Sequence, residues 1–352
     1  MSKPRLLTGD TPTGRLHLGH YVGSLENRVA MQDDYDCYFL LANLHAFTTR
    51  ADKAQSIQDS TLDIALDYLA VGIDPQKSCI FIESEVPSLY ELASILSMLL
   101  PFPRVMRNPT IKDEIRDKGL GDSYSFGFLL YPVLQVADIL GVRAEIVPVG
   151  EDQIPHLEMA REAARKFNQT YCGVSSHAED KDHLKLGGIF PVCHAKMGRM
   201  KRLIGLGAPD KDGRLLKMSK SLNNAIMLSD EPDDIRKKVM GMYTDPKRLK
   251  ATDPGTVENN PLWVFHETFN PDTAWVEEAE AKYRAGTIGD VECKKKLVDV
   301  LVEMLRPMQL RRAHYASDQH EVLKVLRAGN EKANIENEKT LAMVKDAIKQ
   351  VF

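Results

Sequence analysis

Two histidines three residues apart follow a short apolar run near the start of the chain. Residues 11–20 read TPTGRLHLGH, and glycines at positions 9, 14 and 19 let a ligand approach the backbone. A helix beginning near His17 offers free N–H groups and the positive end of its dipole to an anion. On that helix His17 and His20 share one face, so two imidazole N–H donors can bind one phosphate. Many helices carry two histidines at this spacing by chance, so the pair needs supporting context.

A pair of cations supplies that context in the second half of the chain. Residues 217–221 read KMSKS, which puts Lys217 and Lys220 three residues apart in a polar loop. From Cys193 to Lys220 the sequence has eight Lys or Arg and two Asp, a local net charge of +6. A solvated loop could carry this charge, but a phosphate-rich ligand explains it better.

Length and composition limit the class of protein. The chain has 352 residues, enough for two domains, and a net charge of −4 that indicates no general affinity for nucleic acid. Five scattered cysteines without a C-x-x-C pair argue against a disulfide framework. Because the sequence shows no signal peptide and no apolar run long enough to span a membrane, we expect a cytoplasmic protein that has no membrane partner. We expect no protein-bound metal, although zinc-type ligand atoms occur at Cys172, His177, His183, Cys193 and His194.

Strands alternate with helices in the first part of the chain. Apolar runs predict strands over 37–41, 78–82 and 146–149, and periodic patterns predict helices over 53–71, 88–100, 125–140 and 154–167. This alternation favours an α/β fold, a doubly wound parallel sheet of Rossmann-like type that binds a nucleotide. Ligands of such sheets bind beyond the carboxyl ends of the strands, where His45 and Gly150 fall.

The alternation stops after the lysine loop. We therefore divide the chain into a catalytic domain, 1–228, and an all-α C-terminal domain, 229–352. A helix start near Ser229 and separate helices around 297–308, 322–326 and 341–352 are expected. Basic clusters at 236–238, 247–250, 294–296 and 311–312 could hold RNA phosphates or simply cover solvated helix faces.

The histidine and lysine motifs together resemble the two signatures of class I aminoacyl-tRNA synthetases. Within that class, three stretches are similar to tryptophanyl-tRNA synthetases of bacterial type. They read NLHAFT from Asn43, YPVLQVADIL from Tyr131 and VPVGEDQIPHLE from Val147. The resemblance runs from Leu6 to about residue 245 and more weakly through the helical half. It implies a class I catalytic domain, a helical anticodon-recognition domain and a homodimer. The last helix could pack back on the catalytic domain.

The resemblance also assigns roles by position. Catalytic roles fall to His17, His20, Lys112, Lys217 and Lys220. ATP would be bound by Thr11, Thr13, Gly19, His20, Gly150, Asp152, Leu203, Ile204, Lys217, Met218, Ser219 and Lys220. Tryptophan would be bound by Leu7, His45, Tyr131, Gln135, Asp138, Val147, Val149 and Gln153, with Asp138 accepting the indole N–H. Core packing is the alternative for Val147 and Val149, and a surface position for Lys112.

Three positions depart from the pattern of several members. Gln135 stands where they have Met, Thr11 where they have Gln, and Asn43 where they have Asp. One side of the indole pocket is therefore expected to be more polar.

The implied reaction is activation of L-tryptophan by ATP with Mg²⁺, followed by transfer to tRNA(Trp). The alternatives are a tyrosyl enzyme, a nucleotidyltransferase with the same type of phosphate loop, and an RNA-binding paralogue without activity. A nucleotidyltransferase would not need the lysine loop and a long helical half. An inactive paralogue would be expected to lack a signature histidine or lysine, and all four are present.

Overall fold

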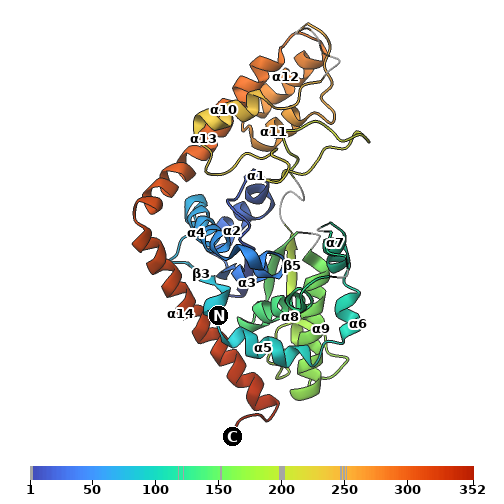
Figure 1. Ribbon diagram of the computed structural model, residues 1–352, viewed down its shortest axis with the longest axis vertical. Helices are drawn as coiled ribbons and strands as arrows, with labels where there is room; N and C mark the ends of the chain where they lie inside the picture. Colours follow the sequence, from blue (N-terminus) through green and yellow to red (C-terminus); the bar gives the residue numbers. More distant parts are fainter. Residues whose placement is uncertain are drawn as a thin grey trace.

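The protein consists of a sheet-based part and a helical part that follow each other along its longest axis (Figure 1). This computed structural model describes residues 3–117, 119–121, 123–150, 153–197, 203–245, 248, 250 and 252–352. The sheet has five parallel strands in the order β3-β2-β1-β4-β5. The strands are β1 (Arg5–Asp10), β2 (Asp36–Leu41), β3 (Ser78–Ile82), β4 (Ile146–Val149) and β5 (His194–Met197). The predicted doubly wound parallel fold is confirmed.

The order in which strands are added to the sheet changes side between β1 and β4. Strands β2 and β3 are added on one side of β1, and β4 and β5 on the other. Leu6 of β1 pairs in register with Cys37 of β2 and with Ile146 of β4. The carboxyl ends of β1 and β4 therefore border the crevice where ligands of such sheets bind.

Helices cover both faces of this sheet. They are α1 (Leu18–His20), α2 (Glu26–Met31), α3 (Asn43–Arg50), α4 (Ala54–Val71), α5 (Ser88–Ser97), α6 (Phe102–Met106), α7 (Pro109–Asp117), α8 (Phe126–Gly141) and α9 (Ile154–Tyr171). A π-helical turn over Tyr21–Leu25 joins α1 to α2. Helix α4 ends where predicted, because Gly72 adopts φ 108° and donates its N–H to Leu69. Short helices α6 and α7 and strand β5 were not predicted.

Successive strand residues face opposite sides of the sheet and build two buried clusters. Leu6 and Phe39 belong to the cluster that includes α4, whereas Leu7 and Leu40 belong to the cluster that includes α5, α8 and α9. Burial on both faces explains why β2 and β3 read as continuous apolar runs. Strand β5 was not predicted because all four of its residues are exposed, so its sequence contains no apolar run.

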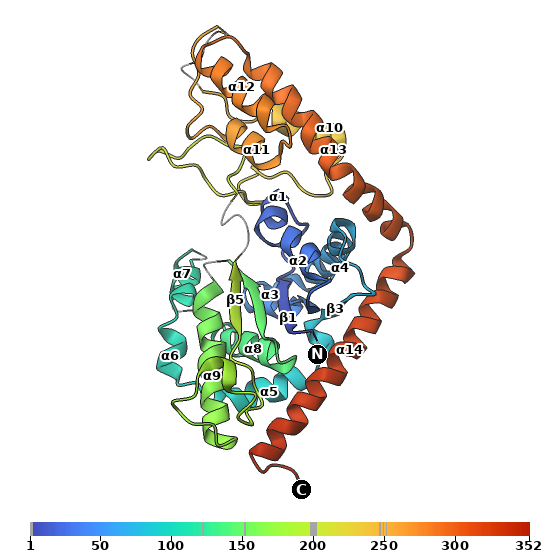
Figure 2. The same ribbon diagram turned by 180° about the vertical axis from the view of Figure 1, so that it is seen from behind.

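The second part of the chain is helical among the residues described. Its helices are α10 (Pro232–Met240), α11 (Pro261–Phe269), α12 (Thr273–Arg284), α13 (Asp290–Ser317) and α14 (Gln319–Ala347). The two separate helices predicted around 322–326 and 341–352 are wrong, since α14 is continuous and ends before Phe352. Both ribbon views show α14 running back along the sheet-based part (Figure 2). No helix in the described ranges is long and apolar enough to cross a membrane.

Helix α14 covers β3, an edge strand of the sheet. Gly329 packs so closely that a Cβ there would collide with the backbone oxygen of Ile80. The Asn330 side-chain oxygen accepts the Ile82 N–H at 2.8 Å, which satisfies a backbone donor of the edge strand. Small and polar residues make this contact, so the middle of α14 lacks the apolar stripe on which the helix prediction depended.

Candidate active site

The signature histidines cap the helix that follows β1. His17 is the N-cap of α1: its Nδ1 accepts the Gly19 N–H at 3.1 Å, and Nδ1 of His20 accepts the His17 N–H at 3.0 Å. A ring nitrogen that accepts a backbone N–H carries no proton itself. Both rings therefore hold their proton on Nε2, and both Nε2–H groups are available as donors.

The two rings are also neutral at physiological pH. Burial, together with the neighbouring His20, Lys220 and Lys217, lowers the pKa of His17 to about 3. Burial likewise lowers the pKa of His20 to about 4, although the Asp10 carboxylate opposes this change. As neutral rings the histidines can offer a phosphate N–H donors only, so positive charge would have to come from other groups.

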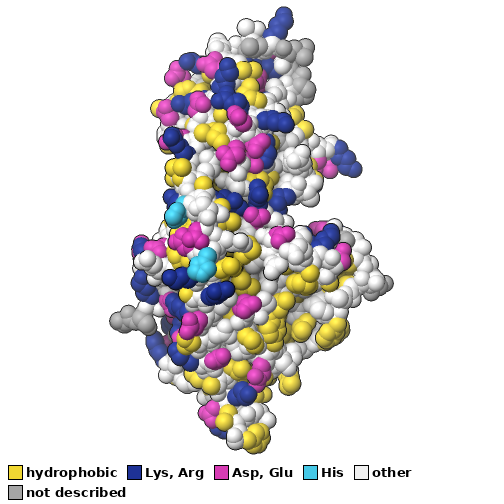
Figure 3. Space-filling model, turned by 60° about the vertical axis from the view of Figure 1, so that its left-hand side comes forward, with side chains coloured by type: hydrophobic (Ala, Val, Ile, Leu, Met, Phe, Trp, Pro, Cys, Tyr) yellow, Lys and Arg dark blue, Asp and Glu magenta, His cyan; other side chains and the backbone are white. Residues whose placement is uncertain are grey.

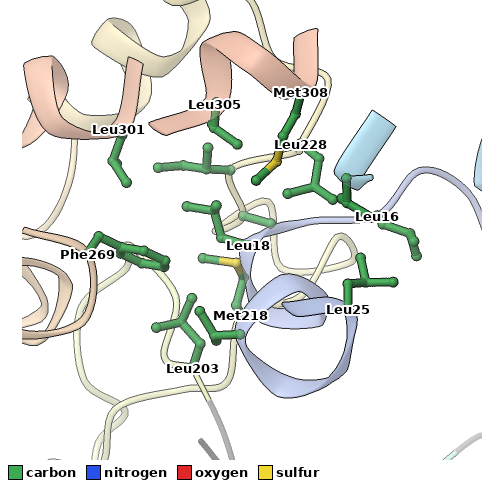
Figure 4. Packing of buried hydrophobic residues seen from close by; sticks show 14 of the residues in the cluster. Leu16, Leu18, Leu25, Leu203, Met218, Leu228, Phe269, Leu301, Leu305 and Met308 are labelled. Carbon is green, nitrogen blue, oxygen red and sulfur yellow. The ribbon is translucent and has the colours of Figure 1, made fainter. Parts of the chain in front are cut away.

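Those charges lie on the lysine loop, which packs against the same helix. Met218, between Lys217 and Lys220, is buried in one cluster with Leu18 and Leu203 (Figure 4). The Asn224 side chain shapes the loop by accepting the Ser219 N–H at 2.7 Å and donating to the Lys217 oxygen at 3.2 Å. Burial of Met218 fixes the point from which both lysines project.

Backbone pairing joins the two motifs directly. His17 forms an isolated antiparallel bridge with Met227, in which the Leu18 N–H donates to the Ile226 oxygen at 3.0 Å. Leu228 donates to the Leu16 oxygen, also at 3.0 Å. The segment after the lysine loop therefore holds the histidine motif in place.

Lys220 already reaches the segment before the histidines. Its Nζ lies 3.1 Å from the Thr13 oxygen, 3.3 Å from the Thr13 hydroxyl and 3.2 Å from the Arg15 oxygen. Burial and the nearby Arg50 lower the pKa of this ammonium group. Lys217, by contrast, is exposed. Phosphate oxygens could replace the three neutral acceptors of Lys220 with a stronger, charged one.

A cleft of about 870 Å³ opens at the carboxyl ends of β1 and β4. Its lining contains most of the residues predicted for ATP and tryptophan. These are Leu7, Thr11, Thr13, His17, Gly19, His20, His45, Tyr131, Gln135, Asp138, Val147, Val149, Gly150, Gln153, Leu203, Lys217, Met218, Ser219 and Lys220. Residues far apart in the sequence thus meet in one cavity of the size of a nucleotide site.

Two predicted residues do not line this cleft in the structure, and a third lies outside the described residues. Lys112 lies exposed on α7 and is not brought to the cleft wall. Ile204 forms a backbone bridge with Lys217, so it supports the loop from behind. Asp152 lies outside the described residues. Their predicted roles remain predictions.

The inner end of the cleft contains a buried carboxylate. Asp138, on α8, is only 2% exposed, and its Oδ1 has no hydrogen-bond partner among the described residues. His45 Nε2 lies 3.9 Å from Asp138 Oδ2, and the His45 and Tyr131 rings meet edge to face at 5.9 Å. A buried acceptor beside an aromatic wall suits a flat ligand with an N–H donor.

A polar bridge forms another side of this pocket. Gln135 Nε2 donates to the Gln153 side-chain oxygen at 3.3 Å. The extra polarity expected at Gln135 is therefore paired within the protein. Asn43, another departure, does not line the cleft and instead exchanges two hydrogen bonds with Ser84, at 2.8 and 3.1 Å. Thr11, the remaining departure, does line the cleft.

A buried ion pair near His20 was not predicted. Arg28 is 2% exposed and donates to Asp10 Oδ2 at 2.7 Å, while the Tyr68 hydroxyl donates to the same oxygen at 2.6 Å. Although burial opposes it, Arg28 lowers the pKa of Asp10. The position of Asp10 after a strand could have suggested it. Nothing in the sequence shows that Arg28, on a helix of mixed composition, points inward.

Glu83 was also missed. It is fully buried beside His45, with its Oε1 2.7 Å from His45 Nδ1. His45, Glu83 and Asp138 offer ligand atoms within 4.8 Å of one another, a spacing that a metal ion can bridge. Two ligands of one small ion lie about 3 Å or more apart, so the 2.7 Å contact favours an ion pair instead. A Glu directly after a buried strand was the available signal.

The remaining zinc-type ligands do not gather. Among the described residues, His45, Glu83 and Asp138 are the one group of three or more such side chains close enough to share an ion. His183 instead makes a 3.1 Å contact from its Nδ1 to the Asn168 amide nitrogen, and Cys193 is buried.

Part of the basic clusters proposed for RNA serves the fold. Lys294 is buried and donates to the Met242 oxygen at 2.7 Å. Arg311 donates to the Ala70 oxygen, and Arg312 pairs with Asp63 and Asp67. These three side chains are therefore engaged by groups of the protein itself. Lys247 and Leu249 lie outside the described residues.

A doubly wound sheet with histidine donors and loop lysines around one cleft defines a nucleotide-binding enzyme that acts on phosphates. Residues 1–306 match the family described as "tRNA synthetases class I (W and Y)". The chain therefore belongs to the class I tRNA synthetases for tryptophan and tyrosine.

Individual relatives agree over almost the whole length. The chain is 45% identical over 355 residues to a tryptophan–tRNA ligase of Streptococcus pyogenes, covering 99% of this chain and 98% of the relative. It is 45% identical over 350 residues to that of Clostridium longisporum, covering 99% and 97%. Among solved structures, tryptophanyl-tRNA synthetase from Campylobacter jejuni complexed with ADP and tryptophan has a TM-score of 0.82 at 28% identity, covering 98% of this chain and 99% of that one.

Proposed function

We propose that the protein activates L-tryptophan with ATP to tryptophanyl-adenylate, releasing pyrophosphate, and transfers the tryptophanyl group to tRNA(Trp). The assignment of tryptophan as the substrate rests on the surroundings of Asp138. Its buried carboxylate keeps one oxygen without a hydrogen bond in the described structure, at the inner end of the cleft. An indole N–H satisfies this acceptor, whereas a phenyl ring cannot, and a tyrosine hydroxyl would be placed differently.

The first step needs positioning and charge more than acid–base catalysis. An oxygen of the tryptophan carboxylate attacks the α-phosphorus of ATP, and the bond from that phosphorus to the bridging oxygen of pyrophosphate breaks. The carboxylate is already ionised, so no general base is required. His17 and His20 donate Nε2–H groups to the phosphates, while Lys217 and Lys220 neutralise charge that moves onto pyrophosphate.

Mg²⁺ belongs to this proposal as a partner of ATP. Asp10, the carboxylate beside His20, already accepts hydrogen bonds from Arg28 and Tyr68. A Mg²⁺ ion that keeps mostly phosphate and water ligands fits such a wall, because it needs no protein cage. When bound, it would supply charge neutralisation at the phosphates.

The tRNA partner is assigned to the helical half. Arg236, Lys237 and Lys295 are exposed there, unlike the buried Lys294. Exposed cations can position an RNA backbone, and unpaired anticodon bases can be read by neighbouring side chains. The division into a catalytic domain, 1–228, and an anticodon-recognition domain, 229–352, is part of the proposal, as is a cytoplasmic location.

A homodimer is the proposed assembly. Hydrophobic side chains gather on the surface of the lower half of the molecule in Figure 3. Large apolar residues exposed there include Met98, directly after α5, Phe102 of α6 and Phe126 of α8, which are 81%, 64% and 78% exposed. A contiguous apolar patch on a protein surface often marks an interface with another chain. Sedimentation should give twice the chain mass, and Phe102→Glu with Phe126→Glu should give single chains.

The decisive experiment is amino-acid-dependent exchange of labelled pyrophosphate into ATP, with each of the twenty amino acids in turn. Tryptophan alone should support exchange. Exchange with tyrosine in place of tryptophan, or with no amino acid, would contradict the assignment.

A further inference from the structure

Three ionisable side chains are buried together at the inner end of the cleft. Glu83 is inaccessible to solvent, and its two oxygens have different neighbours. Oε2 accepts the N–H groups of Leu44 and His45, at 3.0 and 3.3 Å, at the start of α3. Oε1 lies 2.7 Å from Nδ1 of His45. On the other side of the same ring, Nε2 lies 3.9 Å from Asp138. His45 is therefore shared between two carboxylates, and Glu83 holds it more closely.

Contacts from outside the cleft fix Glu83. It lies in the single turn Glu83–Glu85 that follows β3. Asn43 exchanges hydrogen bonds with Ser84 in this turn. Two side chains of α14 also contact this turn. Asn330 accepts the Ile82 N–H, and Asn334 donates to the backbone oxygen of Glu85 at 2.7 Å. The turn is thus clamped on both sides, so Glu83 cannot follow His45 if the ring moves.

The position of His45 decides what Asp138 can bind. A buried carboxylate and a neighbouring imidazolium ring attract each other and form a close ion pair. They stay apart only if another carboxylate holds the ring. Although burial opposes it, the Glu83 carboxylate raises the pKa of His45 to about 9, with a smaller contribution from Asp138. The ring therefore favours its charged form at neutral pH and is attracted mainly to Glu83, whereas burial and the Glu83 carboxylate raise the pKa of Asp138 well above its ordinary value. If Glu83 released it, the ring would close onto Asp138 and occupy the acceptor.

We propose that Glu83 is a positioning residue for amino-acid recognition: it retains His45 and so leaves the Asp138 carboxylate free to accept the ring N–H of the substrate. The inference rests on the proposed function and names a residue that the sequence motifs do not include. Glu83 acts through His45, because the 2.7 Å contact is to that ring and the cleft lining contains His45 but not Glu83.

The test is Glu83→Gln in the full-length protein, measured by tryptophan-dependent pyrophosphate exchange. The amide keeps the shape but loses the charge that holds the ring. We expect kcat/KM for tryptophan to fall about 10- to 100-fold, mainly through KM, which is the range for losing a hydrogen bond to a charged group. KM for ATP should stay within about twofold. The matched control is Glu85→Gln, on the same turn but with an exposed side chain, which should behave as the unmodified protein.

A substrate analogue separates recognition from general damage. With a tryptophan analogue that has sulfur in place of the ring N–H, Glu83→Gln should lose no more than about twofold, since no N–H competes for Asp138. Equal losses for tryptophan and this analogue would overturn the proposal, because they would mean that Glu83 only supports the fold.

The His45→Gln background gives a second test that also serves if Glu83→Gln alone does not fold. In the double variant the two amides can pair, and Asp138 is the one ionisable side chain of the three that is left. Adding Glu83→Gln to His45→Gln should change kcat/KM for tryptophan by less than about twofold. A further tenfold loss would overturn the proposal. If the unmodified protein exchanges pyrophosphate with tryptophan and Glu83→Gln behaves like Glu85→Gln, this inference is refuted and the proposed function stands. If the unmodified protein supports exchange only with tyrosine, the proposed function is refuted.

Discussion

Arg312 of α13 donates from Nε to Oδ1 of Asp67 on α4, at 2.9 Å. The second oxygen of the same carboxylate accepts the Leu16 N–H at 2.8 Å, one residue before His17. Asp67 is fully buried, and Arg312 also reaches Asp63 at 2.8 Å. One carboxylate thus connects the helical half of the chain to the histidine motif. This path joins the part proposed to read RNA to the part proposed to bind phosphate.

Arg312→Met should therefore lower both stability and exchange activity. Removing one partner of a buried ion pair leaves the other charge uncompensated, which costs about 3 kcal/mol or more. Urea unfolding should show this loss, together with slower pyrophosphate exchange. Arg306→Met on the same helix, where the arginine is exposed, is the control. Equal stability of the two variants would show that the Asp67 contact is unimportant.

Lys217→Ala and Lys220→Ala should each slow adenylate formation far more than they weaken tryptophan binding. The lysines act on charge that develops as pyrophosphate leaves, so their contribution is greatest in the transition state. We expect a loss of about 10² or more in the exchange rate for each lysine, as for removal of one oxyanion donor. Single-turnover adenylate formation and tryptophan titration measure the two effects. Lys211→Ala, an exposed lysine outside the cleft lining, is the control. Near-normal rates in both loop variants would assign the loop a structural role.

Asp138→Asn should reduce activation of tryptophan selectively. The amide retains an acceptor oxygen, but it loses the charge that strengthens a hydrogen bond to the indole N–H. The expected loss in kcat/KM is about 2–3 kcal/mol in transition-state terms, since hydrogen bonds to charged groups have this size. The sulfur analogue should be nearly insensitive. If both substrates lost activity equally, Asp138 would support the fold and not recognise the ring N–H.

Acid should destabilise the protein through the signature histidines. The pKa values of His17 and His20 are lowered to about 3 and about 4 from an ordinary value of 6.5. As pH falls below 6.5, the unfolded chain takes up protons on these rings before the folded protein does. Their contribution to stability is therefore complete above pH 6.5 and is lost as pH falls toward 4 and 3.

Thermal unfolding between pH 7 and pH 4 measures this effect. The drop in Tm should be smaller in a variant with His17→Gln and His20→Gln, because its glutamines do not titrate. His194→Gln, which replaces an exposed histidine on β5, should retain the full drop. A double variant as acid-sensitive as the unmodified protein would show that other groups cause the loss.

Local patterns in the sequence were sufficient for the fold class and for most of the cleft. Strands β2, β3 and β4 are buried on both sides and read as apolar runs, and Gly72 marked the end of α4. Glycine spacing and paired cations placed phosphate-binding groups at strand ends without any knowledge of contacts. The resemblance added the residues proposed for tryptophan, and all eight of them line one cleft.

Only the tertiary structure decided which charged residues are buried and what they face. Arg28, Asp67 and Glu83 lie on elements whose sequences do not show that these side chains point inward, yet each is almost inaccessible. The course of α14 was equally hidden, because it packs on β3 through Gly329 and asparagines. Periodicity reports which face of a helix is apolar. It cannot report a close backbone approach or an ion pair, because both depend on a partner distant in the chain.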